Sequence, residues 1–247
     1  TCEELVYPYG RSPLLAEEID RLAKGYGVVV LGIGVNPGFV MDTLPITLTS
    51  VCQDIKSIKV ERVMDAAGRR VPFQKKIGAG LSVDEFRQKI RDKQITGHVG
   101  LEQSVAMIAD ALRWKLQAVE VGAIEPVVAK KPVESKAVKV EAGKVAGLKH
   151  SVSGIMDGKP VIALSFEAYI GAKEEYDSVT IDGTPSIRQK ISPCVHGDLA
   201  TAAIIVNSIS KVVNSDPGLK TMKDLPVPSA ILGDFRLYVN SVSSKKP

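Results

Sequence analysis

The hydrophobic pattern at the start of the chain predicts helix, strand, turn and helix in succession. Residues 12–26 form an amphipathic helical stretch, and residues 27–33 form a short apolar run typical of a buried strand. Asn36-Pro37-Gly38 marks a turn, and residues 39–48 return to a helical pattern. This order predicts an α/β unit whose turn and second helix start lie at the ligand-binding edge of a parallel sheet.

The pattern changes in the middle of the chain. Residues 56–66 alternate like a half-buried strand, and helices are predicted at 83–92 and 102–114. Asp157-Gly158 and Asp182-Gly183 are hairpin signals, which favour antiparallel pairing and an α+β arrangement. Further strands are predicted at 124–128, 137–140, 144–155, 161–169 and 178–181.

The last part of the chain is predicted to contain one helix and an extended segment. Residues 197–214 form an amphipathic stretch rich in small residues, with Asp198 placed as its N-cap. Ala200, Ala203, Ile204 and Val206 would be available for packing. Residues 217–247 are marked by prolines, so we expect them to wrap the surface and to fray at the terminus.

Composition and charge exclude several classes of protein. The 247 residues are 45% hydrophobic, enough to bury a real core, and the net charge of +4 is dispersed, which argues against a nucleic-acid surface. Cys2, Cys52 and Cys194 lack CxxC spacing, so we expect neither a metal site nor disulfides, and a reducing compartment. No apolar run of about 18 residues and no signal peptide is found, so we expect a cytoplasmic protein without a membrane partner.

Several motifs in order give the chain a family resemblance. It resembles the 2,4-diaminopentanoate dehydrogenases and related native amine dehydrogenases, which are similar in fold to dihydrodipicolinate reductase. The resemblance covers nearly all of residues 1–228 but not the family's N-terminal third, where the glycine fingerprint of the dinucleotide site lies. The motifs are TCEELVYP, GIGVNPGFVMDTLP, RRVPFQKKIGAG, GHVGLEQSVAMIADAL, HGDLATAAIIVN and PGLKTMKDLP.

The resemblance and the patterns together predict the domain organisation. We expect an α/β fold in which residues 1–54 are the C-terminal part of a Rossmann-type dinucleotide-binding domain. Residues 55–195 would be an α+β domain, with a mostly antiparallel or mixed open sheet, for substrate binding and dimerisation. Residues 196–228 would return to the nucleotide-binding domain, and 229–247 would be a tail. Because the first unit lacks sheet partners, we expect about a hundred further residues upstream in the natural protein.

The resemblance implies a reaction and a cofactor. The reaction would be the reversible NAD(P)-dependent oxidative deamination of 2,4-diaminopentanoate at its 4-amino group, giving 2-amino-4-oxopentanoate and ammonia. NAD and NADP both remain open, because the residue that distinguishes the ribose belongs to the uncovered third. The partners implied are a small-molecule amine or amino-acid substrate and a second copy of the chain in a homodimer.

The chemistry needs a carboxylate beside the nicotinamide, and the family's glutamate corresponds to Glu3. It would take a proton from the amine and later activate water. Neighbouring residues on a strand point to opposite faces, so only one of Glu3 and Glu4 is expected to face the substrate. We favour Glu3. The competing interpretation is that both are solvated charges.

Cofactor contacts are expected from the first residues and from the turn. The candidates are Thr1, Cys2, Asn36, Pro37 and Gly38. The Asn36 amide can donate and accept at once, although Asn before Pro also commonly starts a turn. A GxGxxG motif beginning at residue 32 is rejected, because Pro37 stands in place of the third glycine.

Substrate contacts are expected from a basic cluster that would hold a carboxylate. Arg69 and Lys75 are the leading candidates, because arginine grips a carboxylate bidentately and lysine acts as a point charge. Each could instead belong to a solvated loop. The whole cluster is Arg69, Arg70, Gln74, Lys75 and Lys76.

Three further residues are candidates for the substrate pocket. Arg62 would qualify if its side chain points inward. His98 is placed there by the resemblance, although a lone histidine is more often structural. Thr201 lies near a predicted helix start and could reach a ligand or serve only as a cap.

Two other functions compete with an amine dehydrogenase. One is a non-catalytic binding or dimerisation domain. The other is a dihydrodipicolinate-type reductase, but the paired histidine motif with its KxDxPSGT continuation is absent around residues 69–80.

Overall fold

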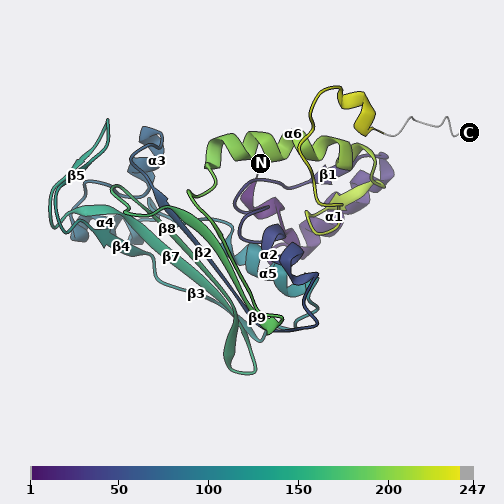
Figure 1. Cartoon of the computed structure of the whole chain (residues 1–247), viewed down its shortest axis with the longest axis horizontal. Helices are drawn as coiled ribbons and strands as arrows, with labels where there is room; N and C mark the ends of the chain where they lie inside the picture. The colour runs from purple at the N-terminus through teal and green to yellow at the C-terminus, as the bar shows by residue number, and fades with distance from the viewer. Residues whose placement is uncertain (1, 240–247) are drawn as a thin grey trace, which may run out of the picture.

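A computed structural model describes residues 2–239 of the chain. Figure 1 shows a long twisted sheet at one side and a group of helices with a small sheet at the other. In the small sheet β1 (Val29–Leu31) pairs in parallel with β11 (Gly218–Lys220), so segments far apart in sequence meet here. The N-terminal helical elements are η1 (Glu3–Leu5), η2 (Pro8–Gly10), α1 (Pro13–Gly25) and α2 (Thr43–Thr49).

The long sheet has seven strands and is mixed. Its order is β10-β9-β2-β8-β7-β3, with β4 also paired to β7. Only β2 and β8 run parallel, and all other pairs are antiparallel. The predicted fold class is therefore confirmed. The strands are β2 (Asp54–Asp65), β3 (Ala118–Val121), β4 (Glu125–Val128), β7 (Val145–Met156), β8 (Lys159–Tyr169), β9 (Tyr176–Thr184) and β10 (Ile187–Ile191).

Helix α5 (Leu101–Ala111) forms the main core by packing on β7 and β8. Leu101, Val105 and Ile108 recur at helical spacing and are almost completely buried against the sheet. The remaining elements are α3 (Val71–Lys76), α4 (Val83–Arg91), β5 (Val133–Glu134), β6 (Lys139–Val140), α6 (Gly197–Val213) and η3 (Phe235–Tyr238).

Most long elements lie where the pattern predicts them, and short ones were missed. The helices predicted at 12–26, 83–92 and 102–114 correspond to α1, α4 and α5. The helix expected from Phe39 begins only at Thr43, because residues 38–42 form turns and Asp42 accepts a hydrogen bond from the Thr43 N–H at 2.6 Å. The α-helices and strands not predicted are α3, β3, β5, β10 and β11, and the 3-10 helices η1, η2 and η3 were not predicted either.

One hairpin signal is correct and the other is wrong. Asp157 and Gly158, with φ of 51° and 70°, form the turn between β7 and β8. Asp182 and Gly183 instead lie inside β9. Glycine is required at position 183 because strands β9 and β2 approach closely there: a Cβ would lie 2.2 Å from the carbonyl oxygen of Asp54.

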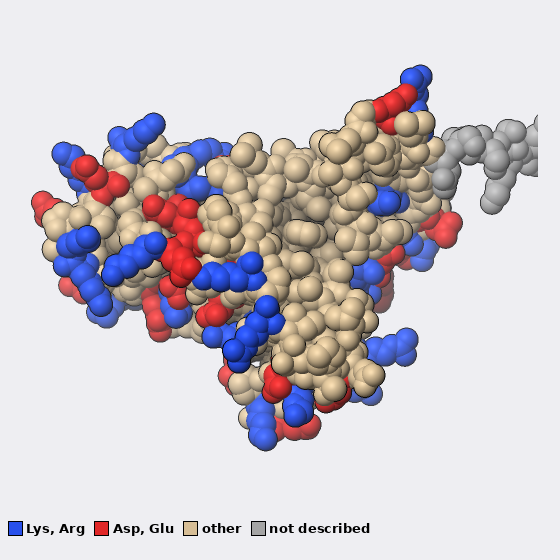
Figure 2. Space-filling view, in the orientation of Figure 1, with Lys and Arg blue, Asp and Glu red and all other residues tan. Residues whose placement is uncertain are grey.

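Helix α6 is exposed over much of its apolar surface. Its N-cap is His196, whose Nδ1 accepts from the Leu199 N–H, whereas Asp198 lies in the first turn, which corrects the predicted cap. Ala203 and Val206, expected to pack, are exposed. In Figure 2 the surface over α6 is largely free of charge, while charged side chains gather over the long sheet.

The residue boundaries of the four predicted segments stay a prediction. The predicted tail falls partly outside the described residues, since residues 240–247 are not described. Among residues 2–239, the helices are all too short or too polar to cross a membrane.

Candidate active site

Two adjoining cavities form a cleft between the N-terminal segment, the loop after β1, and the start of α6. Their volumes are about 90 Å³ and about 200 Å³. Because they share four lining residues, they are two parts of one cleft. The shared residues are Glu3, Val35, Asn36 and Thr201.

Glu3 lies in η1, a 3-10 helix, and not on the expected strand. Its side chain is exposed, and it lines both cavities, whereas Glu4 lines neither. Asn36 and Glu3 therefore face the same cleft from segments more than thirty residues apart. An exposed carboxylate at the wall of a cleft is free to exchange protons with a ligand.

The loop that contains Asn36 is fixed by the buried carboxylate of Asp42. Asp42 Oδ2 accepts from the Gly38 N–H at 2.7 Å and from the Ser104 hydroxyl of α5 at 2.8 Å. The Thr43 hydroxyl donates to the Gly38 carbonyl at 2.9 Å. Burial raises the pKa of Asp42, and the donors around it oppose that shift. This network ties the Asn36 loop to the helix that forms the core.

The Asn36 side chain is the clearest sign that the cleft can bind a ligand. Its Nδ2 and Oδ1 are both buried and have no hydrogen-bond partner among residues 2–239. Buried polar atoms without partners are rare in folded proteins, because each loses its hydrogen bonds to water without replacement. The amide therefore has one donor and one acceptor available to a molecule in the cleft.

The larger cavity has a basic wall. Arg69 and Lys76 line it, and the Arg69 guanidinium lies 5.1 Å from the centre of the Phe73 ring. Arg69 also contacts the Asp198 carboxylate at 3.3 Å, while its Nε is buried without a partner among the described residues. These two cations can attract a carboxylate, and Arg69 has the planar donor geometry to bind one.

Arg62 points inward, as its candidacy required, but its guanidinium is already engaged. Its side chain is 1% exposed, contacts the Asp177 carboxylate at 2.6 Å and donates to the Val195 carbonyl at 2.5 Å. Burial raises the pKa of Asp177, although the neighbouring Arg62 charge lowers it. Arg62 lines the larger cavity and also joins β2 to β9 and to the segment before α6.

His98 forms part of the same wall as a neutral ring. It stacks on Phe166 with ring centroids 4.3 Å apart, and its Nε2 is buried without a partner among residues 2–239. Burial lowers the pKa of His98 to about 3, helped by the nearby positive charges of Arg62 and Lys76. A neutral imidazole can donate or accept one hydrogen bond but adds no charge.

We expect His98 to make the protein less stable in mild acid. Below its ordinary pKa of 6.5, the unfolded histidine takes up a proton, whereas the folded one stays neutral down to about pH 3. The free energy of unfolding should therefore fall as the pH decreases through this window. Urea unfolding at several pH values should show a shallower fall for His98→Phe. If the free energy of unfolding depends on pH in the same way for both proteins, the expected titration of His98 is wrong.

Three predicted residues lie outside the cleft. Gln74 is 2% exposed, and it donates to the carbonyls of Ala67 and Arg69, so it supports the Arg69 loop. Lys75 lines a neighbouring cavity, which Lys76 lines as well, and of these two lysines only Lys76 also lines the cleft. Gly38 is held against Asp42 and does not line the cleft.

The other predicted residues are placed as follows. Cys2 and Pro37 line the smaller cavity, and Thr201 lines both. Thr1 lies outside the described residues. Phe73, Phe166 and Asp198 also line the larger cavity and were not predicted to do so. Asp198 stands in the HGDLAT motif, which could have indicated a pocket residue. Within residues 2–239, no group of three potential metal ligands is found.

The fold is that of an amine dehydrogenase. The structure of the amine dehydrogenase from Mycobacterium smegmatis matches with a TM-score of 0.76 at 21% identity, covering 91% of this chain and 66% of that one. A 2,4-diaminopentanoate dehydrogenase of Acetoanaerobium sticklandii is 41% identical over 240 residues, which are 96% of this chain and 68% of the relative. The chain thus spans about two thirds of the length of both proteins.

The family assignment follows from a second match. Residues 39–241 match the family model of the 2,4-diaminopentanoate dehydrogenase C-terminal domain. The chain belongs to this family, which confirms the resemblance seen in its motifs. It is an oxidoreductase by family, and the family implies a nicotinamide cofactor.

Proposed function

We propose that this chain forms the substrate end of an enzyme that oxidatively deaminates 2,4-diaminopentanoate, giving 2-amino-4-oxopentanoate and ammonia reversibly. The observation that supports the proposal most strongly is the shared cleft of Glu3 and Asn36, where the Asn36 amide has no partner among the described residues. The 41% identity to a protein named for this substrate supports the choice of reaction. NAD and NADP, a homodimer and a cytoplasmic location all stay predictions.

The smaller cavity fits the edge of a nicotinamide ring. Its wall combines the unpaired Asn36 amide with Pro37 and Cys2, so a carboxamide could exchange hydrogen bonds with Asn36 while apolar atoms cover the ring. When bound, the cofactor supplies the hydride acceptor.

In this proposal Glu3 moves the protons. As a carboxylate, it would take a proton from the substrate ammonium, leaving the nitrogen lone pair free to support loss of hydride from the same carbon. After releasing that proton to solvent, Glu3 would take a proton from water as the water oxygen attacks the resulting iminium carbon, which gives a carbinolamine. Glu3 would pass this proton to the nitrogen, so that ammonia leaves, and would accept the hydroxyl proton as the ketone forms. The net products are then the ketone, ammonia, the reduced cofactor and two protons released to solvent.

In this proposal Arg69 and Lys76 hold the substrate carboxylate. Both line the larger cavity, which Cys2 does not line, and His98 and Thr201 add neutral hydrogen-bonding groups there. Anchoring one end of the substrate at this basic wall would direct the other end toward Glu3 and Asn36. The orientation would select the 4-amino group over the 2-amino group.

We expect Arg69→Met to raise KM for 2,4-diaminopentanoate by roughly tenfold or more, because a charge-assisted hydrogen bond is lost. Reductive amination of 2-pentanone, which lacks the carboxylate, should change little. Lys75→Met is the matched control, since Lys75 is near in sequence but lines another cavity. If Arg69→Met lowers activity equally on 2-pentanone and on 2,4-diaminopentanoate, Arg69 does not bind the substrate carboxylate. That result would leave the proposed role of Glu3 unaffected.

A further inference from the structure

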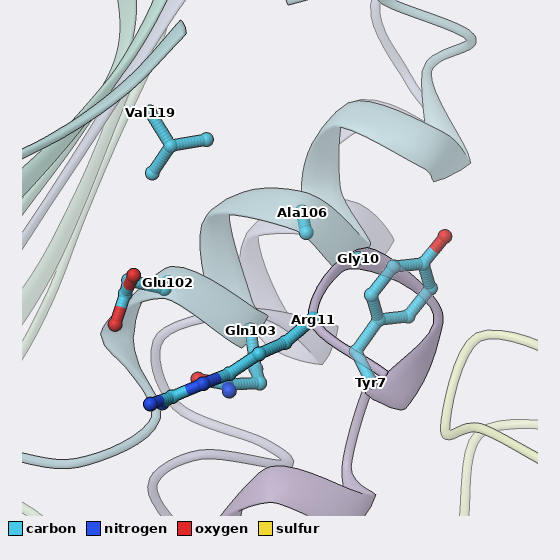
Figure 3. Close-up of a pocket in the computed structure, with 7 residues that line it drawn as sticks. All are labelled: Tyr7, Gly10, Arg11, Glu102, Gln103, Ala106 and Val119. Atoms are coloured by element: carbon cyan, nitrogen blue, oxygen red, sulfur yellow. The ribbon is translucent and has the colours of Figure 1, made fainter. Parts of the chain in front are cut away.

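A third cavity lies outside the reaction cleft, between η2, the first turns of α5, and β3. Its volume is about 280 Å³, and it shares no lining residue with the two cavities of the cleft. This size is near the lower end of ligand pockets, roughly 300–1,000 Å³, and suits a small metabolite better than a nucleotide. Figure 3 shows the lining residues, which are Tyr7, Gly10, Arg11, Glu102, Gln103, Ala106 and Val119.

The cavity has one positive and one negative side chain that are not paired with each other. Arg11 follows η2, and Glu102 lies in the first turn of α5. Neither side chain makes a hydrogen bond or salt bridge with another of residues 2–239, although the charge of Glu102 acts on His150. In Figure 3 the Arg11 side chain extends along the start of α5, toward the side where Glu102 lies. Two unpaired opposite charges on one cavity match a ligand that has both charges itself.

Gln103 gives an independent sign that the cavity takes a ligand. This residue is 3% exposed, and its Oε1 is buried with no hydrogen-bond partner among the described residues. Leaving such a carbonyl unpaired costs about 1–3 kcal/mol, which a hydrogen-bond donor on a ligand would recover. The amide oxygen is an acceptor suited to an ammonium N–H.

We propose that this cavity binds a free α-amino acid. The carboxylate would contact Arg11, the ammonium would lie between Glu102 and Gln103, and the side chain would lie along Ala106 and Val119. Gly10 and Ala106 leave room because their side chains are small or absent. The proposal does not rest on the deamination reaction, since no residue of the reaction cleft takes part.

The test is isothermal titration calorimetry of the intact protein with L-alanine, L-norvaline and L-phenylalanine as probes. We expect at least one of them to bind, and pentanoate and pentylamine, each with one charge, to bind at least about tenfold more weakly than norvaline. Arg11→Gln and Glu102→Gln should each weaken the binding at least about tenfold. Lys75→Met, which lines neither this cavity nor the reaction cleft, is the control and should leave the binding unchanged. Arg69→Met reports on any binding of the same probes in the reaction cleft.

Gln103→Met separates a binding role from a structural one. Because the amide oxygen is unpaired in the free protein, methionine should leave the melting temperature unchanged or raise it, yet weaken amino-acid binding. The proposal is overturned if none of the three probes binds at millimolar concentration. It is equally overturned if binding survives in Arg11→Gln and Glu102→Gln, or is lost only in Arg69→Met.

Discussion

Glu3→Gln is expected to lower kcat for 2,4-diaminopentanoate by roughly 10²- to 10⁴-fold, the range of a lost general acid-base group. Glutamine keeps the size of the side chain in the cleft but cannot take the proton of the ammonium group or of water. The affinity for the nicotinamide cofactor should stay nearly unchanged. Steady-state kinetics together with cofactor titration would measure both quantities on the same preparation.

Glu4→Gln is the matched control for this prediction. Glu4 is the neighbouring carboxylate on η1 and lines neither part of the cleft. It should retain almost all of the wild-type activity. If Glu3→Gln retains activity while Glu4→Gln loses it, the assignment of the proton-transfer group is wrong.

Arg62→Met is expected to destabilise the fold by about 3–5 kcal/mol, because it leaves the buried Asp177 carboxylate without its cation. In this variant the pKa of Asp177 in the folded protein should rise further above its pKa in the unfolded chain. The loss should thus be smaller in acid, where Asp177 is protonated, and grow as the pH rises through the folded-state pKa. Urea unfolding across this range measures the effect.

The double variant Arg62→Met with Asp177→Leu provides the control for this pair. Removing both charges leaves no isolated buried ion, so the double variant should be more stable than Arg62→Met alone. If the two variants are equally unstable, the damage comes from lost packing around Arg62, and the ion-pair explanation is incorrect.

The sequence predicted the long elements of the fold well because they have clear periodicity. The prediction was wrong where the same residues can serve either of two structural roles. Asp182-Gly183 has the composition of a turn, but Gly183 serves the close approach of β9 to Asp54. The three-residue strands β1 and β11 pair with each other although they lie near opposite ends of the chain. A strand as short as β11 has no recognisable hydrophobic pattern.

Helix α3 was not predicted from the sequence, so there was no basis for distinguishing the positions of Lys75 and Lys76. On a helix, residues three apart share a face, so Phe73 and Lys76 line the reaction cleft together. Lys75 lines only the neighbouring cavity, which Lys76 lines as well. A helix prediction for residues 71–76 would have put Lys76, and not Lys75, on the face of Phe73.

Glu3 and Asn36 were predicted through the family motifs, but the contacts that hold the walls of the cleft were not. The Asp42 carboxylate reaches Ser104, 62 positions along the chain, and no local pattern predicts a contact of that range. Likewise, nothing in the spacing of His98 indicates that it stacks on Phe166. Such contacts are decided by the packing of α5 on the sheet.

The most direct test is product analysis by mass spectrometry after the intact protein is incubated with 4-deuterated 2,4-diaminopentanoate and NAD or NADP. Our account predicts ammonia and 2-amino-4-oxopentanoate in equal amounts, with the deuterium transferred to the reduced cofactor. Loss of the 2-amino group, or no reaction with either cofactor, would contradict the assignment of this cleft.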